Sequence, residues 1–456
     1  MKHNSKQLLA FLAGVQWADI PHEVSHQAKR CIVDYMAAVL AGSQTNEARK
    51  AYRGIQDTHL GSQASGIGFD GKLSCLGAAF MNGLSGHALE VDDGNRFAMG
   101  HPGVVVIPAV LSIGEWRNLS GRELLLSIIV GYEVFGRVAR AVSPNHFDKG
   151  FHPTGTCGTF AAAIACSKLL GHSKLLMEQC LGLAGSMSSG LFEFLSDGSN
   201  AKLLNVADAA QSGIQAAFLA DAGLTGPPSI LEGPRGFFQA VSNTVNPEIL
   251  TEGLGLQYQI MDTYVKMHAC CRHLHTTIDS MIKLRSENSF ALEDIDSIVV
   301  HTYEAAAKLN NKDIGTPLAG RMSIPYCAAV ALIEGKVSCD QFNTATILDE
   351  TVRKLVQKVE VRFDRELQKY VPQERPARVI IALKNGKEYS TETRLPYGEK
   401  ENPVSDIDLN GKFESLAGNL CSHKSAQALL ETLWNLEAVG NIADLMKMCQ
   451  QALAEQ

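Results

Sequence analysis

The sequence lacks the features of several common functional classes. No Cys-x-x-Cys pair occurs, which argues against a zinc ribbon or a thioredoxin-like redox motif. The net charge is −7 without a basic stripe, so neither nucleic acid nor a membrane surface is an expected partner. No apolar run reaches the length of a membrane-spanning helix. The eleven cysteines are irregularly spaced, and we expect free, buried thiols in a cytoplasmic protein.

Familiar cofactor and nucleophile motifs are missing as well. No Gly-x-Gly-x-x-Gly fingerprint follows a predicted strand, no P-loop occurs, and no Gly-x-Ser-x-Gly elbow appears. Nicotinamide, nucleotide and serine-hydrolase functions are therefore disfavoured. What remains is a site built from His, Asp, Glu, Lys, Arg and Tyr, with no metal and no organic cofactor.

Apolar periodicity predicts a mostly α fold with two domains, because 456 residues exceed what one hydrophobic core usually supports. The first, all-α domain takes residues 1–265 and the helical tail 396–456, so that both ends of the chain contribute to it. Ser120 and Glu123 form a capping-box pattern within it. An apolar helical pattern runs over residues 21–41, and Gly42 is a glycine stop for it. Helices are also expected over residues 73–91, 103–118, 121–142, 155–171, 175–193 and 205–224.

The second domain, residues 266–395, is predicted to be a smaller α+β lid. Residues 295–303 and 359–363 alternate like strands, and residues 378–394 form a hairpin with Asn385-Gly386 at its turn. Helices are expected over residues 267–285, 323–335 and 346–358. We expect a small-molecule site in the cleft between the two domains.

The densest group of candidate site residues lies in residues 83–108, where charged side chains interrupt apolar, core-like sequence. On a helix, His87, Glu90 and Asp93 would share one face, and Arg96 and His101 would follow on a loop. A capped helix with a solvated acidic end is the alternative interpretation. The candidates are, in order, His87, Glu90, Asp93, Arg96 and His101.

Two further candidates lie beside predicted helices. His152 occupies a turn just before a helix, whose N-terminus attracts carboxylates through its N–H groups. A turn histidine without any chemistry is the alternative. Lys202 follows a polar break, where a lone lysine is usually solvated.

A second dense cluster runs from Lys266 to His275 and contains Cys271 and Arg272. Its histidines and thiols fit no common metal-ligand spacing, so anion binding by the lysine, the arginine and a histidine is the preferred interpretation. Tyr326 lies near the start of a helix that Ser323 opens, and its hydroxyl is a candidate donor. The alternative is an aromatic side chain that only packs.

Taken in order, these segments resemble the MmgE/PrpD family over nearly the whole chain. The matching segments are Asn82-Gly with His87-Ala-Leu-Glu-Val-Asp-Asp, Gly100-His-Pro-Gly, Ser120-Gly-Arg-Glu with Gly131-Tyr-Glu-Val, Gly150-Phe-His-Pro-Thr-Gly, Gly182-Leu-Ala-Gly-Ser, Gly223-Leu-Thr-Gly-Pro, Lys266 with Cys271-Arg272 and His275, Ser323-Ile-Pro-Tyr326, and Asn402-Pro. Known members include 2-methylcitrate dehydratases, cis-aconitate decarboxylases and an iminodisuccinate epimerase.

The resemblance implies a homodimer, a large helical domain with a smaller α+β lid, and chemistry without metal or cofactor. It places the site at Glu90, His101, His152, Lys202, Lys266, Cys271 and Tyr326. The chain departs from decarboxylase-like members, which carry Asp in place of Glu90, Thr in place of Gly94 and His in place of Cys271. Many relatives also carry a histidine shortly after the lysine that corresponds to Lys202, where this chain has Asn205. The segment from Asp92 to Arg96 is similar to the epimerase-like branch.

We expect general acid–base chemistry on a small di- or tricarboxylate. His101 or His152 would remove the α-proton, and the other would deliver a proton. Tyr326 would assist, and Glu90 or Asp93 would orient a histidine.

Positively charged groups would hold the substrate carboxylates, namely those of Lys202, Lys266, Arg272 and Arg96, with Cys271 beside them. A hydro-lyase of the 2-methylcitrate dehydratase type is the expected activity. An epimerase of the iminodisuccinate type is the first alternative. A cis-aconitate-type decarboxylase and a non-catalytic carboxylate-binding dimer are the others.

Overall fold

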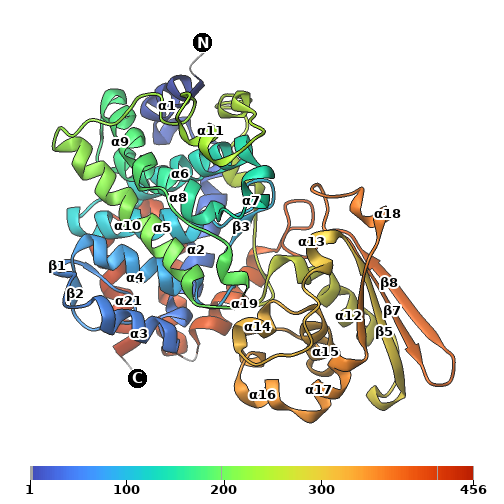
Figure 1. Cartoon of the computed structure of the whole chain (residues 1–456). Helices are drawn as coiled ribbons and strands as arrows, with labels where there is room; N and C mark the ends of the chain where they lie inside the picture. Colours follow the sequence, from blue (N-terminus) through green and yellow to red (C-terminus); the bar gives the residue numbers. More distant parts are fainter. Residues whose placement is uncertain (1–3, 197, 419, 455–456) are drawn as a thin grey trace. The chain divides into compact units, whose positions relative to one another are not determined.

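The computed structural model describes residues 4–196, 198–418 and 420–454 (Figure 1). Helices dominate this part of the chain, which confirms the predicted mostly α class. The chain divides into two compact units. Unit 1 comprises Met1–Ala88, Asp92–Tyr264 and Ser405–Gln456, and unit 2 comprises Leu89–Val91 and Val265–Val404. The lid role of the smaller unit and the cleft stay predictions.

Small residues allow the central helices of unit 1 to pack closely. Helix α8 (Pro153–Leu169) packs against α5 (Gly103–Arg117), α6 (Gly121–Val142) and α10 (Ala201–Asp221). A Cβ atom added at Gly158 in α8 would lie only 3.1 Å from the Val105 side chain of α5. Nearly every residue of α5 and α8 is buried, so these two helices form the interior of the unit.

The remaining helices and strands of unit 1 surround this interior. The helices are α1 (Asn4–Gly14), α2 (His22–Gly42), α3 (Asn46–Ile55), α4 (Cys75–His87), α7 (Asn145–Asp148), α9 (Lys174–Met187), α11 (Phe237–Val241), α19 (Asp406–Ala417), α20 (His423–Trp434) and α21 (Ile442–Ala454). The strands are β1 (Leu60–Ser65), β2 (Lys72–Leu73), β3 (Gly94–Asn95) and β4 (Thr263–Tyr264). Within the described residues, no helix has both the length and the apolar character needed to cross a membrane.

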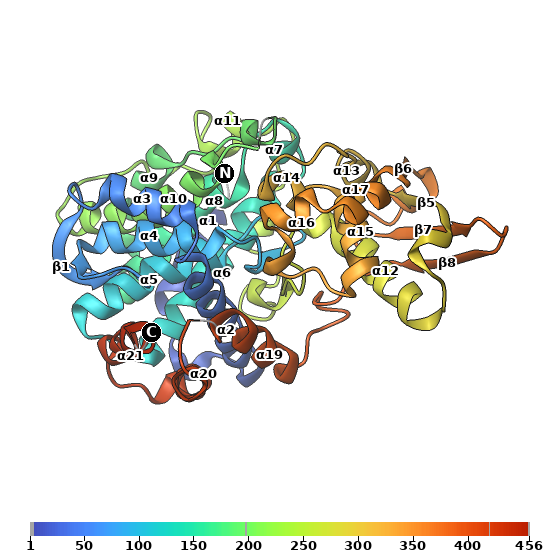
Figure 2. The same ribbon diagram turned by 90° about the horizontal axis from the view of Figure 1, so that it is seen from below.

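The C-terminal helices pack against N-terminal ones. Helix α19 contacts α2, and α21 contacts α5 (Figure 2). A buried ion pair joins the two ends of the chain, with Lys412 Nζ of α19 lying 2.5 Å from Asp34 Oδ1 of α2. Both side chains are almost completely withdrawn from solvent, so each charge depends on the other.

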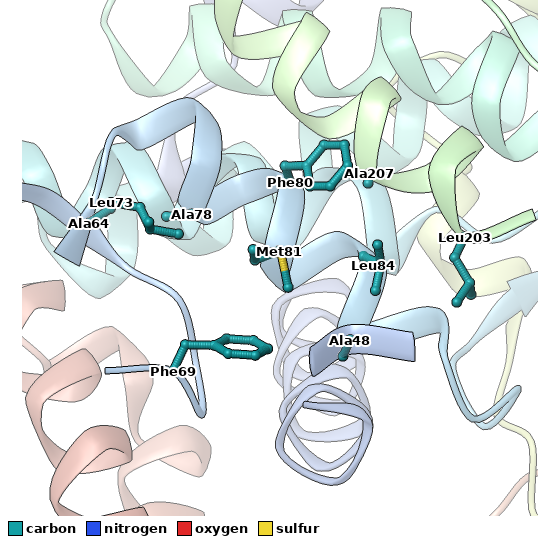
Figure 3. Close-up of a cluster of buried hydrophobic side chains, with 10 residues drawn as sticks. All are labelled: Ala48, Ala64, Phe69, Leu73, Ala78, Phe80, Met81, Leu84, Leu203 and Ala207. Carbon is teal, nitrogen blue, oxygen red and sulfur yellow. The ribbon is translucent and has the colours of Figure 1, made fainter. Parts of the chain in front are cut away.

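A buried apolar cluster anchors the two helix ends that carry candidate site residues. Phe80 and Leu84 of α4 pack with Phe69 from the turn after β1 and with Leu203 of α10 (Figure 3). Burying each such side chain contributes about 1.5–3 kcal/mol. The cluster therefore holds the last turn of α4 and the first turn of α10 in place.

One glycine pattern overturns a detail of the sequence analysis. The segment Gly66–Gly71 has the Gly-x-Gly-x-x-Gly spacing and follows strand β1, contrary to our expectation. The chain then turns into β2, which is antiparallel to β1, whereas a dinucleotide fingerprint needs a strand that leads into a helix. Lys72, just after these glycines, pairs with Glu115 at 3.2 Å. Nucleotide binding remains disfavoured, now on structural grounds.

Unit 2 contains a four-stranded sheet in the order β6-β5-β7-β8. Strand β5 (Ile295–Thr302) runs parallel to β6 (Val359–Phe363) and antiparallel to β7 (Ala377–Leu383), which pairs with β8 (Glu388–Thr393). The predicted strands and hairpin are confirmed. Gly386 has a φ of 83°, the left-handed conformation that an Asn-Gly turn requires.

Helices α12 (His275–Glu287) and α15 (Ile324–Glu334) pack on the sheet of unit 2. Alternate residues of β7 are buried, as expected for a strand with helices on one face. The shorter helices of the unit are α13 (Glu304–Ala307), α14 (Pro317–Arg321), α16 (Thr344–Leu348), α17 (Glu350–Gln357) and α18 (Arg365–Gln368).

Candidate functional site

Helix α4 ends at His87, so the predicted common helix face for His87, Glu90 and Asp93 is wrong. Glu90 adopts a left-handed conformation with φ 58°, which turns the chain away from the helix axis. Carboxylates beyond a helix C-terminus are also unfavourable for helix continuation, because the dipole is negative there. The loop that follows does carry Arg96 and His101, as predicted.

Asp92 of unit 1 connects two imidazole rings. Its Oδ2 lies 2.9 Å from Nδ1 of His87 and 3.2 Å from Nδ1 of His101. The His101 Nδ1 also lies 2.5 Å from the backbone oxygen of Asp93. A carbonyl oxygen only accepts hydrogen bonds, so Nδ1 of His101 must carry the proton. In the neutral ring this leaves the lone pair on Nε2.

The Asp93 carboxylate does not orient a histidine, which corrects one of our expectations. Its Oδ2 accepts a 2.5 Å hydrogen bond from the Tyr132 hydroxyl, and its Oδ1 accepts one from the backbone N–H of Gly103 at 3.1 Å. Burial raises the pKa of Asp93 to about 8, with Asp34 and Asp92 adding to the rise and the hydrogen bonds opposing it. Asp92 therefore takes the role that the sequence analysis gave to Asp93.

His152 is the N-cap residue of α8, as its predicted place in a turn before a helix requires. Its ring is buried against Phe192, with the ring centroids 4.7 Å apart. The first turn of α8 also contacts His101, because the backbone N–H of His101 donates to Thr154 Oγ1 at 3.1 Å. The start of α8 therefore lies next to both candidate histidines.

Lys202 is buried, so the alternative of a solvated lysine is wrong. It lies in the first turn of α10, whose start is held by the apolar cluster around α4. Asn205, three residues later on the same helix, places Nδ2 at 3.2 Å from His152 Nδ1. Residues three apart share a helix face, so Lys202 lies on the side of α10 that faces His152.

Arg96 is also buried, with its guanidinium 4.7 Å from the centroid of the Phe97 ring. Such a cation–π contact is worth about 0.5–2 kcal/mol and shields the planar face of the guanidinium. Its predicted contact with a substrate carboxylate stays a prediction.

In unit 2, Glu90 pairs with Lys266, and its expected role in orienting a histidine stays a prediction. The Lys266 Nζ atom lies 3.1 Å from Glu90 Oε2, and both side chains are almost completely buried. A buried charge is costly unless it is paired, so this contact stabilises both side chains. The pair joins the short segment Leu89–Val91 to the rest of unit 2.

The segment after Lys266 is not the helix that we predicted, because α12 begins only at His275. Arg272 lies in a short 3-10 turn and is almost completely buried. Its five N–H groups all have acceptors inside unit 2, namely Glu399 Oε1, His275 Nδ1 and the backbone oxygens of Tyr397 and Pro396. This guanidinium therefore holds the polypeptide together, and its role toward a substrate stays a prediction.

Cys271 and Tyr326 complete the predicted residues of unit 2. Cys271 is half-buried, and its backbone N–H donates to the Arg321 oxygen at 3.0 Å. Tyr326 starts α15 as predicted, with its N–H donating to Ser323 Oγ, but its hydroxyl donates to the backbone oxygen of Gln341 at 2.5 Å. Burial also raises the pKa of the Tyr326 hydroxyl, which makes this group a poor proton donor.

The donor atoms of His87, Asp92 and His101 lie within 4.8 Å of one another, a spacing that a metal ion could also use. Both Nδ1 atoms already face the Asp92 carboxylate at hydrogen-bonding distance. Hydrogen bonds from the two imidazoles to the Asp92 carboxylate explain this geometry without a metal ion.

The sequence analysis missed Asp92 and Asn205 as site residues. Asp92 lies beside Asp93 in the sequence and carries the same local signal, so no pattern distinguished the two. Asn205 was noted only as a departure from relatives. The predicted helix began only at residue 205, whereas α10 begins at Ala201, so the face that Lys202 and Asn205 share was not visible from the prediction.

Comparison with known proteins covers both parts of the chain. The model of the MmgE/PrpD N-terminal domain matches residues 6–250, and that of the MmgE/PrpD C-terminal domain matches residues 268–438. A cis-aconitate decarboxylase-like protein of Aspergillus oryzae is 27% identical, covering 97% of this chain and 96% of the relative. The human cis-aconitate decarboxylase is 27% identical, covering 96% of this chain and 92% of the relative. The cis-aconitate decarboxylase of Aspergillus terreus is 25% identical, covering 94% of this chain and 92% of the relative. With both family models matched in order along its length, the chain belongs to the MmgE/PrpD family.

Proposed function

We propose that this protein is a lyase that removes water from a small di- or tricarboxylate, as 2-methylcitrate dehydratases do. The observation that carries the proposal is the Asp92–His101 pair of unit 1. The hydrogen bonds at Nδ1 place the lone pair of His101 on Nε2, where it can accept a proton. A carboxylate beside the ring stabilises the imidazolium that forms.

Dehydration requires such a base, because the carbon next to a carboxylate must lose a proton. In the proposed reaction His101 Nε2 first accepts this proton, and negative charge develops on the carboxylate oxygens. The C–O bond then breaks and a C=C bond forms. The departing hydroxyl then takes the proton back from His101 and leaves as water, which restores the enzyme. General base assistance of this kind contributes about 10²–10⁴-fold to the rate.

Positive charge near the base supports a carboxylate substrate. The buried Lys202 lies on the face of α10 that contacts His152, and the N–H groups at the start of α8 add the positive end of a helix dipole. An ammonium attracts a carboxylate more strongly in a buried position than in water. The contact of the Lys266 ammonium with a substrate carboxylate stays a prediction.

Decarboxylation is the second candidate, and the names of the relatives favour it. In that reaction the bond to the departing CO₂ breaks, and the resulting carbanion takes up a proton. No base is needed to begin it, so the Asp92–His101 pair favours dehydration. An epimerase would use the same base but return the proton to the opposite face of the carbon.

Product analysis by NMR in D₂O distinguishes these reactions. The full-length protein is incubated with 2-methylcitrate, citrate, cis-aconitate, iminodisuccinate or tartrate. Dehydration predicts an unsaturated tricarboxylate from one of the two citrates. Release of CO₂ from cis-aconitate would replace the proposal with the second candidate, and inversion without net loss would make the protein an epimerase.

Two variants control this experiment. His101→Ala removes the base and should abolish product formation, while His423→Ala alters an exposed histidine of α20 and should leave it unchanged. Specific binding of a carboxylate with no deuterium exchange in any compound would contradict the proposal and indicate a carboxylate-binding protein.

A further inference from the structure

We propose that His152 acts as a neutral hydrogen-bond donor through Nε2–H, and that Asn205 is the positioning residue that fixes this tautomer. The inference rests on the proposed function. When a proton leaves the carbon beside a carboxylate, negative charge develops on the carboxylate oxygens. A fixed N–H aimed at that oxygen stabilises the charge without a proton transfer of its own.

The orientation of the Asn205 amide follows from two acceptors. Its Nδ2 lies 3.2 Å from the backbone oxygen of Leu191 and 3.2 Å from Nδ1 of His152. The Leu191 carbonyl can only accept, so the amide nitrogen must be the atom on this side. An NH₂ group has two hydrogens, one for each of the two acceptors. His152 therefore presents a lone pair at Nδ1, and the proton of its neutral ring is on Nε2.

The backbone fits closely around this amide. A Cβ atom at Gly155 would lie 3.3 Å from the Cβ of Asn205, and one at Gly190 would lie 3.5 Å from its Cγ. Gly190 has a φ of 140°, and its oxygen accepts the backbone N–H of His152 at 3.0 Å. The loop at Gly190 and the start of α8 thus hold the amide and the imidazole in one arrangement.

The surroundings of His152 favour a neutral ring. The side chain is buried against Phe192 and Phe194, with centroid distances of 4.7 and 5.5 Å. It also caps α8 at the positive end of the helix dipole, where a second positive charge is unfavourable. An imidazole that is neutral and accepts at Nδ1 is a donor at Nε2.

His101 and His152 are therefore held in opposite tautomers. His101 carries its proton on Nδ1, because Asp92 and the Asp93 carbonyl accept there, whereas His152 carries its proton on Nε2. Nε2 of His101 accepts a proton, and Nε2 of His152 donates a hydrogen bond. The hydrogen-bond partners thus assign one histidine as the base and the other as the oxyanion donor.

The test is the tautomer of His152 in the full-length protein, measured by ¹⁵N NMR with labelled histidine and assigned with His152→Gln. The wild type should show a protonated Nε2 and an unprotonated Nδ1. In Asn205→Asp the carboxylate can only accept, so Nδ1 should become protonated. Gln211→Glu makes the same amide-to-acid change on α10 and should leave the His152 signals unchanged. A wild-type ring protonated at Nδ1, or an unchanged spectrum in Asn205→Asp, would overturn the assignment.

Turnover provides the second readout. Removing one oxyanion donor typically lowers kcat by about 10²–10³-fold, so Asn205→Asp should lose that much kcat with little change in KM. Unchanged kcat in a variant whose tautomer has switched would overturn the donor role. Because the spectrum is recorded without substrate, it tests the tautomer even if no compound of the panel reacts. Failure of the proposed function is thereby distinguished from failure of this inference.

Discussion

Replacing Asp92 with Asn tests the pair on which the proposed chemistry depends. The carboxylate Oδ2 faces Nδ1 of both His87 and His101, at 2.9 and 3.2 Å. An amide has one oxygen to accept from these rings and no charge to stabilise an imidazolium. A hydrogen bond to a charged group contributes about 1.5–3 kcal/mol, which corresponds to a loss of roughly 10- to 150-fold in kcat.

The assay measures kcat and KM of Asp92→Asn beside those of Asp93→Asn. The two substitutions are identical in chemistry and adjacent in sequence, but the Asp93 side chain contacts Tyr132 and the Gly103 N–H rather than a histidine. We expect Asp93→Asn to change kcat far less. Equal losses in both folded variants, or unchanged kcat in Asp92→Asn, would refute the reasoning.

Two further predictions concern stability. Because burial raises the pKa of Asp93 to about 8, the folded chain retains a proton there that the unfolded chain releases near pH 4. The free energy of unfolding should thus fall as pH rises from about 4 to 8, and Asp93→Asn should reduce this slope in urea titrations; equal slopes would contradict it. Lys412→Met removes the buried ion pair with Asp34 and should cost about 3–5 kcal/mol in urea unfolding. Adding Asp34→Asn should recover part of that loss, and purely additive losses would argue against the pair.

Local sequence signals predicted much of the fold. The Asn385-Gly386 turn specified the hairpin, and the Ser120–Glu123 capping box is present at the start of α6. Both signals act within a few residues, so the sequence displays them directly. The strand and hairpin predictions in unit 2 agree with the structure for the same reason.

The site was harder to predict because its contacts are long-range. The reversal of the chain after His87 decides that Asp92, and not its neighbour, faces the two imidazoles. Lys202 is buried because the apolar cluster around α4 holds the start of α10, which residue spacing alone does not show. The pairing of Glu90 with Lys266 spans 176 positions in the sequence.

The most direct test of the account is deuterium exchange at the carbon beside the substrate carboxylate, in the wild type and in His101→Gln. The exchange rate is measured by NMR in D₂O with the compound that the wild type converts. The account predicts exchange in the wild type and a loss of about 10²–10⁴-fold in the variant. Exchange at the wild-type rate in a folded His101→Gln protein would contradict the claim that His101 is the base.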